Sequence, residues 1–365
     1  MSITEKIKAI FVDIKDPRQR INQLYSLESL LFIAFCAVIS GYGSFHGMED
    51  YAVAHEAALR EVIDLPAGQL PTHDTFNRLF AALDYRNFEK NFIEFTQTIA
   101  VKTKTFLAFD GKTIRNAGSP LQIVSAWCAS NHMVLAQTKV CEKSNEITAI
   151  PLLLDLLEIA GAVVTIDAMG CQREICGKIL DKKGHYVIAL KGNQGTLFED
   201  VKTCFHHAVP DDITHSWEEW DKGHGRIEQR QCLVISHLDW LQERHLWPGL
   251  NSIALVKSKR LIGSKETTES RYYISSLEPD AALIGRATRI HWEVENNLHW
   301  CLDVTFNEDK ACITTGHAPE NMSIMRKIAL NLLNAQKTKR DPSLKSMQRR
   351  CAMSFPYLMK ILSAF

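Results

Sequence analysis

Two short apolar runs of this chain each end on an aspartate, and they constrain the fold more than any other feature. Residues 105–110 read Thr-Phe-Leu-Ala-Phe-Asp, and residues 162–167 read Ala-Val-Val-Thr-Ile-Asp. Both runs stop at a turn residue or a lysine and do not continue at helical spacing, which is typical of buried strands. In sheets that alternate with helices, ligands bind at the carboxyl ends of the strands. We therefore expect Asp110 and Asp167 at one sheet edge, where their charges repel unless a cation lies between them.

The overall composition is that of an ordinary globular protein and leaves any basic surface local. A chain of 365 residues with 46% hydrophobic and 23% charged residues can form two or three domains with their own cores. Its 42 Lys and Arg balance 42 Asp and Glu, so net charge gives no hint of nucleic acid. Residues 321–365, however, carry nine Lys and Arg against one Asp. This segment is either a solvated helical tail or a surface for phosphate contact.

Cysteine usage and the absence of a leader segment predict a cytoplasmic protein. The ten cysteines include no C-x-x-C pair and the N-terminus does not read as a signal peptide, so we expect reduced thiols. The apolar run 30–39 is about half the length of a membrane span and is followed by Gly41 and Gly43. We expect it to be a buried helix.

Residues 1–100 read as helical throughout. Ser26 is a candidate N-cap for a helix over 27–39 and Thr72 for a helix through residue 83, and a third helix is expected over 85–100. Short turns permit a helix-turn-helix interpretation in which residues 72–78 enter a DNA groove. The alternative is a small helical bundle that binds nothing.

From residue 104 the pattern changes to strands and helices in alternation. After the Asp110 strand we expect strands at 123–129 and 133–140, a helix at 145–159, the Asp167 strand, a helix at 172–180 and a strand at 185–190. Residues 195–275 interrupt this pattern with short strands at 229–235, 252–256 and 271–275 among acidic, Trp-bearing loops, and a long helix begins near residue 280. Periodicity alone predicts a mixed α/β protein. The element order resembles the ribonuclease H-like fold.

Two aspartates at one sheet edge suit phosphodiester chemistry. Such chemistry needs an activated nucleophile and a stabilised leaving oxygen, and two Mg²⁺ ions roughly 4 Å apart supply both when carboxylates hold them. A helix beside the sheet edge can bring a third carboxylate, for which Glu295 and Glu293 compete in the sequence Trp292-Glu-Val-Glu-Asn. Helical spacing places these two glutamates about 200° apart, so only one of them can face the site.

Several blocks of the sequence resemble DDE transposases of bacterial insertion sequences, and among these the H-repeat-associated subgroup. The acidic blocks are Asp110-Gly-Lys, Asp167-Ala-Met-Gly and Trp292-x-x-Glu295. Further matching blocks begin at Pro71, Lys143, Lys191, Gly223, Arg271 and Glu295. The blocks cover nearly the whole chain in the same order. The 128 residues between Asp167 and Glu295 match relatives with a β-strand insertion before the glutamate.

The resemblance implies an α/β fold with a ribonuclease H-like mixed sheet and a β-strand insertion, preceded by an all-helical N-terminal domain. The domains would be a helical, DNA-binding region at 1–100, a catalytic domain at 101–310 with its insertion at about 195–275, and a basic helical region at 311–365. Asp110, Asp167 and Glu295 would be the catalytic triad and would hold two Mg²⁺ ions, for which Mn²⁺ can substitute.

The implied activity is DNA transposition, in which element ends are cut and joined to target DNA. The partners would be double-stranded DNA, as terminal inverted repeats and as target, and a second copy of the chain in the DNA complex. One rival is a non-transposing nuclease on the same fold, which would share all three carboxylates. A second rival is a DNA-binding relic, but its expected mark is a broken triad, and all three positions here hold acids.

Basic residues near the expected site are candidates for DNA contact. Lys112 and Lys191 follow strand ends and either contact phosphate or are exposed turn lysines. A Gly-flanked turn and its neighbour supply His224, Arg226 and Arg230, which either grip a DNA backbone or form structural salt bridges. Arg289 lies near His291, which stands where relatives carry an arginine four residues before the glutamate.

Two further polar residues have open roles. Glu146 opens the helix between the two aspartate strands, where it either caps that helix or serves as an extra acid. His299 lies one helical turn after Glu295 and could be a hydrogen-bonding neighbour of a metal ligand.

Overall fold

The computed structural model describes residues 14–18, 23–99, 106–140, 145–223, 225–341 and 343–363. Its N-terminal part is helical, as the sequence predicts, with α2 (Leu27–Ile39), α3 (Phe45–Ala54), α4 (Glu56–Arg60), α5 (His73–Ala82) and α6 (Tyr85–Ile99). The Ser26 hydroxyl caps α2 by accepting a hydrogen bond from the Ser29 N–H. Nearly every residue of α2 is buried, so the apolar run is a core helix and not a membrane span.

Two features of the helical part differ from the prediction. The sequence does not predict α3 and α4, because α3 buries only four residues and has a weak apolar stripe. The connection between α4 and α5 runs over residues 61–72. This connection is much longer than the 3–4-residue turn of a helix-turn-helix motif. Residues 72–78 therefore do not form the tight motif that the sequence permits.

The central part of the chain forms the predicted alternation of strands and helices. Its elements are β1 (Phe106–Ile114), β2 (Leu121–Cys128), β3 (Met133–Lys139), α7 (Glu146–Leu156), β4 (Val163–Ile166), α8 (Arg173–Asp181) and β5 (His185–Leu190). Strand β1 pairs antiparallel with β2 and parallel with β4, and β4 pairs parallel with β5, so the sheet is mixed. This arrangement is the ribonuclease H-like sheet that the element order predicts.

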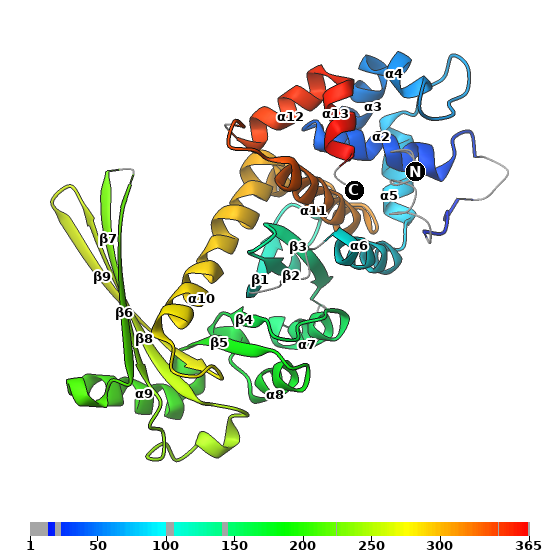
Figure 1. The fold of residues 1–365 in the computed structure, drawn as a ribbon. Coiled ribbons are helices and arrows are strands. Elements are labelled where there is room, and N and C mark those ends of the chain that lie inside the picture. The colour runs from blue at the N-terminus through cyan, green and yellow to red at the C-terminus, as the bar shows by residue number, and fades with distance from the viewer. Residues whose placement is uncertain are drawn as a thin grey trace.

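The insertion extends this sheet and does not form a separate one. It contains α9 (Gly195–His207), β6 (His215–Gly223), β7 (Arg226–Ile235), β8 (Ser252–Ile262) and β9 (Lys265–Ser275). The order of strands is β3-β2-β1-β4-β5-β9-β8-β7-β6. Figure 1 shows the ends of these long hairpins projecting away from the rest of the molecule. The distal residues of these strands are mostly exposed and polar, so hydrophobic patterning predicts shorter strands and misses β6. The sequence interpretation also misses α9.

Helix α10 (Ala281–Val294) covers one face of the sheet, while α7 and α8 cover the other. Alternate strand residues divide between the two cores: Val163 packs in the core beneath α10, and Val164 packs in the core of α7 and α8. The chain continues from α10 into π-helical segments over Glu295–His299 and Cys301–Thr305.

The C-terminal helices return to the N-terminal helices. They are α11 (Ala318–Gln336), α12 (Leu344–Met353) and α13 (Phe355–Leu362). Helix α11 packs against α2, α5, α6 and β3, and α12 packs against α2, so the two ends of the chain share one helical layer (Figure 1). Asn331 of α11 fixes this layer to the sheet, because its amide both accepts from and donates to the Val134 backbone, each at 2.8 Å.

Candidate active site

Strand register brings Asp110 and Asp167 together. In the parallel pairing of β1 with β4, Phe109 lies opposite Ile166, so the next residues on the two strands are the two aspartates. Phe106 and Val163 are also register partners, and both pack in the core beneath α10. Side chains two and four residues further along lie on that same face. Asp110 and Asp167 therefore point to the α10 side at one edge of the sheet, as the sequence predicts.

Each aspartate is held by local backbone N–H groups. Asp167 Oδ1 accepts hydrogen bonds from the N–H groups of Met169, at 3.0 Å, and Gly170, at 3.3 Å, and so caps the short 3₁₀ turn after β4. Asp110 Oδ1 accepts from the Gly111 N–H at 2.9 Å. These bonds orient both carboxylates and leave the Oδ2 atom of Asp167 without a hydrogen bond to protein among the described residues.

Glu295 reaches the same place from α10. A cavity of about 400 Å³ is lined by Asp110, Asp167 and Glu295 together with residues of β5, α9, β9 and α10. Glu293 does not line this cavity, in agreement with the angular separation of the two glutamates. The backbone changes from α-helix to π-helix at Glu295. π-helical turns are uncommon in proteins, but those that occur are often found at functional sites.

The carboxylates influence one another electrostatically. Burial first, and then the negative charges of Glu146, Asp167 and Glu295, raise the pKa of Asp110 to about 7, against a lowering by the Gly111 N–H. Such a shift is a free-energy penalty on the ionised form that a bound cation would remove. Perturbed carboxylates in a cavity are typical of functional sites.

Glu146 is a fourth acid of this site. Its carboxylate lies against Gly111, on the face of β1 opposite Asp110, and accepts a hydrogen bond from Gln122 at 2.8 Å. Burial and then the charge of Asp167 raise the pKa of Glu146. The N-cap of α7 is instead the Asn145 side chain, which accepts from the Ile147 N–H. Glu146 thus influences the two aspartates through its charge, and it does not cap the helix.

Two histidines lie beside the carboxylates, one on α10 and one on the π-helical segment that follows it. Burial lowers the pKa of His291 to about 4, and its Nδ1 lies 3.4 Å from the Thr165 hydroxyl. Burial and then Lys112 lower the pKa of His299 to about 4, and its Nδ1 lies 3.6 Å from Asp110 Oδ2. Both imidazoles are therefore neutral near pH 7. His299 can donate to or accept from Asp110 without adding charge.

The donor set fits hard divalent cations. The carboxylates of Asp110, Asp167 and Glu295 line the cavity, and Mg²⁺ prefers oxygen ligands with open positions for water. Among the described residues, the donor atoms of Asp110, Asp167 and Glu295 do not form a group within 4.8 Å of one another. That spacing is too wide for three ligands of a single ion.

Comparisons with known proteins decide the family. The family model described as "Transposase DDE domain" matches residues 102–332, and the model "DDE_Tnp_1-associated" matches residues 8–96. The protein "Putative transposase YncI" of Escherichia coli O157:H7 is 37% identical, with 100% of this chain and 96% of the relative covered. The protein "H repeat-associated putative transposase YhhI" of Escherichia coli strain K12 is 36% identical, with 96% of each covered. This chain belongs to the DDE transposase family.

A solved structure supports the fold of this DDE transposase. The piggyBac transposase, solved as a synaptic complex with hairpin DNA, superposes with a TM-score of 0.53 at 12% sequence identity, covering 98% of this chain and 81% of that chain. An identity this low supports the ribonuclease H-like fold only. The family and the fold together make the chain a polynucleotidyl transferase that acts on DNA.

One wall of the transposase's cavity is aromatic. Phe198, Tyr272 and Trp292 line it, and the guanidinium of Arg271 lies 4.1 Å from the centre of a Trp292 ring. Arg271 also donates to Glu269 at 2.8 Å. Sequence reasoning marks the Arg271 block only by resemblance, because no local pattern shows that β9 and α10 will meet here.

Lys191 and Lys112, both predicted to contact phosphate, occupy different environments. Lys191 is exposed and lines the cavity beside the carboxylates, so its contact with a phosphate stays a prediction. Lys112 is largely buried in ion pairs with Asp303 and, at 2.8 Å, with Glu308. Because carboxylates already surround its ammonium, this geometry favours a structural role for Lys112. It is neither a free phosphate ligand nor an exposed turn lysine.

The arginines of the insertion also have carboxylate partners. Arg226 and Arg230 both pair with the buried Glu228, and Arg289 of α10 pairs with Glu219 at 3.1 Å and Asp221 at 3.3 Å. These contacts match the salt-bridge alternative of the sequence interpretation, and DNA contact by the three arginines stays a prediction. His224 lies outside the described residues.

The basic C-terminal segment is partly internal in this transposase. Arg326 and Lys327 of α11 are 2% and 3% exposed, and burial lowers the pKa of Lys327 to about 8. These two cations face Glu308 and Gln137, so they are unavailable to phosphate. Lys337, Lys339 and Arg340, by contrast, are exposed just beyond α11.

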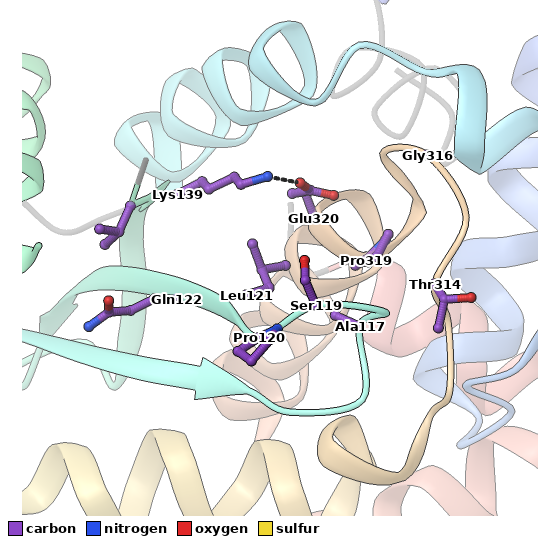
Figure 2. A pocket seen from close by; sticks show the side chains of 11 residues that line it. Ala117, Ser119, Pro120, Leu121, Gln122, Lys139, Thr314, Gly316, Pro319 and Glu320 are labelled. Carbon is purple, nitrogen blue, oxygen red and sulfur yellow. Dashed lines mark hydrogen bonds and ion pairs between the residues drawn. The ribbon is translucent and has the colours of Figure 1, made fainter. Parts of the chain in front are cut away.

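A second cavity lies between the turn after β1 and the start of α11. It has a volume of about 280 Å³, and Figure 2 shows Lys139 of β3 reaching across it to Glu320, with 2.7 Å between the charged atoms. Gln122 lines this cavity and donates to Glu146. Among the described residues, no helix is long and apolar enough to cross a membrane.

Proposed function

We propose that this transposase cuts DNA at the ends of its element and joins the resulting 3′-hydroxyls to target DNA. Asp110, Asp167 and Glu295 are the ligands of two Mg²⁺ ions in this proposal, with Mn²⁺ as a substitute. The observation that carries it is the register of β1 and β4, which delivers two aspartates to one edge beside the Glu295 end of α10.

When bound, the ions would activate a water or a 3′-hydroxyl and would neutralise charge on the phosphate. The protein's own groups position the reaction. Backbone N–H groups fix the orientation of Asp110 and Asp167, and the neutral His299 adds no competing charge. Lys191 lines the cavity, and in this proposal it holds a phosphate oxygen. No side chain has to serve as general base, because the ions would supply this activation when bound.

DNA would contact the protein mainly through phosphates. The exposed cations beyond α11 and the exposed outer side of the N-terminal helices are the surfaces we infer for this contact. Joining two element ends requires two active sites, so we infer a homodimer in the DNA complex. We also infer a cytoplasmic location, where bacterial DNA is found.

The test is a cleavage and strand-transfer assay on DNA carrying the ends that flank the gene, with Mg²⁺, Mn²⁺ or a chelator. We expect Asp167→Asn and Glu295→Gln each to lower cleavage by about 10³-fold or more while DNA binding is kept, because each removes a ligand carboxylate. Glu293→Gln is the matched control on the same helix and should cleave normally.

Normal cleavage by Asp167→Asn or Glu295→Gln would contradict the proposed site. A protein that cuts the ends but never joins a pre-cleaved 3′-hydroxyl to target DNA would be the nuclease alternative. An intact protein that binds the ends and reacts with neither ion would be a relic.

A further inference from the structure

Away from the catalytic sheet, three potential metal ligands meet in the N-terminal helices. The side chains are His46 and Glu49 of α3 and His73, the first residue of α5. One donor atom from each lies within 4.8 Å of the donors of the other two. Within the part of the chain that the structure describes, this is the one group of three or more such side chains that meets this distance.

Local structure explains why the three meet. The Ser44 hydroxyl caps α3 by accepting from the Gly47 N–H, which fixes the start of the helix. His46 and Glu49 are three residues apart on α3 and so share one face. Glu49 Oε2 accepts from the His73 N–H at 2.8 Å and lies 2.7 Å from His73 Nδ1. These two contacts join the start of α5 to α3.

Helix capping alone does not account for the whole group. A cap needs only Glu49 and the His73 N–H, yet the ring of His46 also lies over His73, with centroids 3.9 Å apart. Hydrogen bonds from the His73 backbone and then its side chain lower the pKa of Glu49. Two imidazoles beside one carboxylate form the donor set of many transition-metal sites.

We propose that His46, Glu49 and His73 bind one divalent transition-metal ion of the Zn²⁺ class, and that this ion holds α3 and α5 together. Imidazole nitrogen suits Zn²⁺ and does not suit Mg²⁺, so the site is chemically distinct from the carboxylate site of the sheet. Three protein ligands leave a position for water, and the exposure of His46 gives an entry path.

A neighbouring acid supports the assignment. Asp74 Oδ1 lies 3.7 Å from His73 Nε2, the ring nitrogen opposite the one that faces Glu49. A carboxylate beside the second nitrogen of a ligating histidine fixes the ring and strengthens it as a ligand. Asp74 is therefore a positioning residue in this proposal. The site does not depend on transposition, so failure of one proposal leaves the other intact.

The experiment is titration of the full-length protein with ZnCl₂ in buffer containing millimolar Mg²⁺, followed by calorimetry and thermal unfolding. We expect one equivalent of Zn²⁺ to bind and to raise the unfolding temperature, because an ion that binds only the folded state stabilises it. His46→Phe keeps a ring against His73 but has no donor nitrogen, and His73→Gln keeps a hydrogen-bonding side chain beside Glu49. Each should weaken Zn²⁺ binding at least about tenfold, and the pair about 100-fold.

His55→Phe, at the other end of α3, is the matched histidine control and should bind Zn²⁺ as the wild type does. Co²⁺ gives a second readout, because a cysteine ligand would produce a thiolate charge-transfer band, and this site predicts none. The proposal is overturned if the wild type binds no Zn²⁺ under these conditions. It is equally overturned if the double variant binds with wild-type affinity or if the Co²⁺ spectrum shows thiolate.

Discussion

At the scale of single residues, Asp110 is the group whose chemistry depends most on its surroundings. Its pKa of about 7 arises first from burial and then from Glu146, Asp167 and Glu295. A metal ligand must be deprotonated, so metal binding at this site competes with a proton. The same four acids that attract a cation therefore also make that attraction depend on pH.

We expect Mg²⁺ affinity to fall below about pH 7, approaching tenfold for each pH unit, as Asp110 takes up its proton. The measurement is Mg²⁺ titration of the full chain between pH 5.5 and 8.5. Affinity that is independent of pH over this range would contradict a raised pKa at Asp110.

In the metal-free protein, the raised pKa of Asp110 should also make the free energy of unfolding depend on pH. The folded-state pKa of Asp110 lies above the ordinary value of 3.8, so the folded protein holds this proton more tightly than the unfolded chain does. The resulting stability is present below about pH 4 and is lost as the pH rises to about 7. In chelator, the free energy of unfolding of Asp110→Asn relative to that of the wild type should therefore increase by roughly 2–4 kcal/mol when the pH is raised from 4 to 8. Urea unfolding at both pH values measures this difference.

Gly111 is a second residue whose identity follows from its neighbours. A methyl group there would collide with the Glu146 carboxylate. We expect Gly111→Ala to displace Glu146 and to lower cleavage, while the fold survives because the displaced group is the flexible end of a side chain. Glu146→Gln should have a similar effect. The double variant should be no worse than either single variant, since both changes act through one carboxylate. Additive losses in cleavage would show that the two residues act independently.

At the scale of elements, a buried ion network joins the catalytic strand to the C-terminal helix. Lys112 of β1 pairs with Glu308, and Arg326 of α11 lies 3.7 Å from the same acid. Glu308 is 1% exposed, and its pKa is lowered by the cations around it although burial alone would raise it. One acid thus compensates the charges of segments about 200 residues apart in sequence.

Removal of this acid should strongly destabilise the protein. We expect Glu308→Gln to lower the free energy of unfolding by about 3–5 kcal/mol, because it leaves buried cations without their counter-charge. Chemical denaturation measures the loss, and Glu278→Gln at an exposed position is the control. A loss below about 1 kcal/mol would mean that water or another acid satisfies these cations.

At the scale of the whole molecule, charge is balanced in total but not in its distribution. Arg326 and Lys327 belong to the internal network, whereas Lys337 and Lys339 are exposed beyond α11. Only the exposed cations can release counterions from DNA. The formal net charge of zero therefore does not argue against DNA binding.

We expect affinity for element-end DNA to fall steeply with salt. Replacing Lys337 and Lys339 by serine should reduce the slope of log affinity against log salt by up to about 2, from about 0.9 for each phosphate contact. Lys182→Ser with Lys183→Ser, at the C-terminal end of α8, removes the same charge and should leave the slope unchanged. Equal slopes for all three proteins would exclude the C-terminal surface from DNA contact.

The sequence predicts those parts of the fold in which local pattern and burial agree. The apolar run of α2, the strands that end on Asp110 and Asp167, and the alternation through β5 are all present as expected. The pattern fails for α3, for β6 and for the outer halves of β8 and β9. In α3 few side chains are buried. In the strands the outer residues are mostly exposed, and backbone pairing between polar strands determines the structure.

The sequence by itself indicated the family, the two aspartate strands and, through the family resemblance, Glu295 as the expected third acid, because these depend on spacing and residue type along the chain. Only the tertiary structure decided the roles of Glu146, Lys112 and His73. Glu146 lies against Gly111 on the other face of β1 from Asp110, Lys112 is enclosed by acids from beyond α10, and His73 meets α3 across a loop. A local pattern cannot contain such contacts, because the partner residues are distant in sequence and are brought together only by packing.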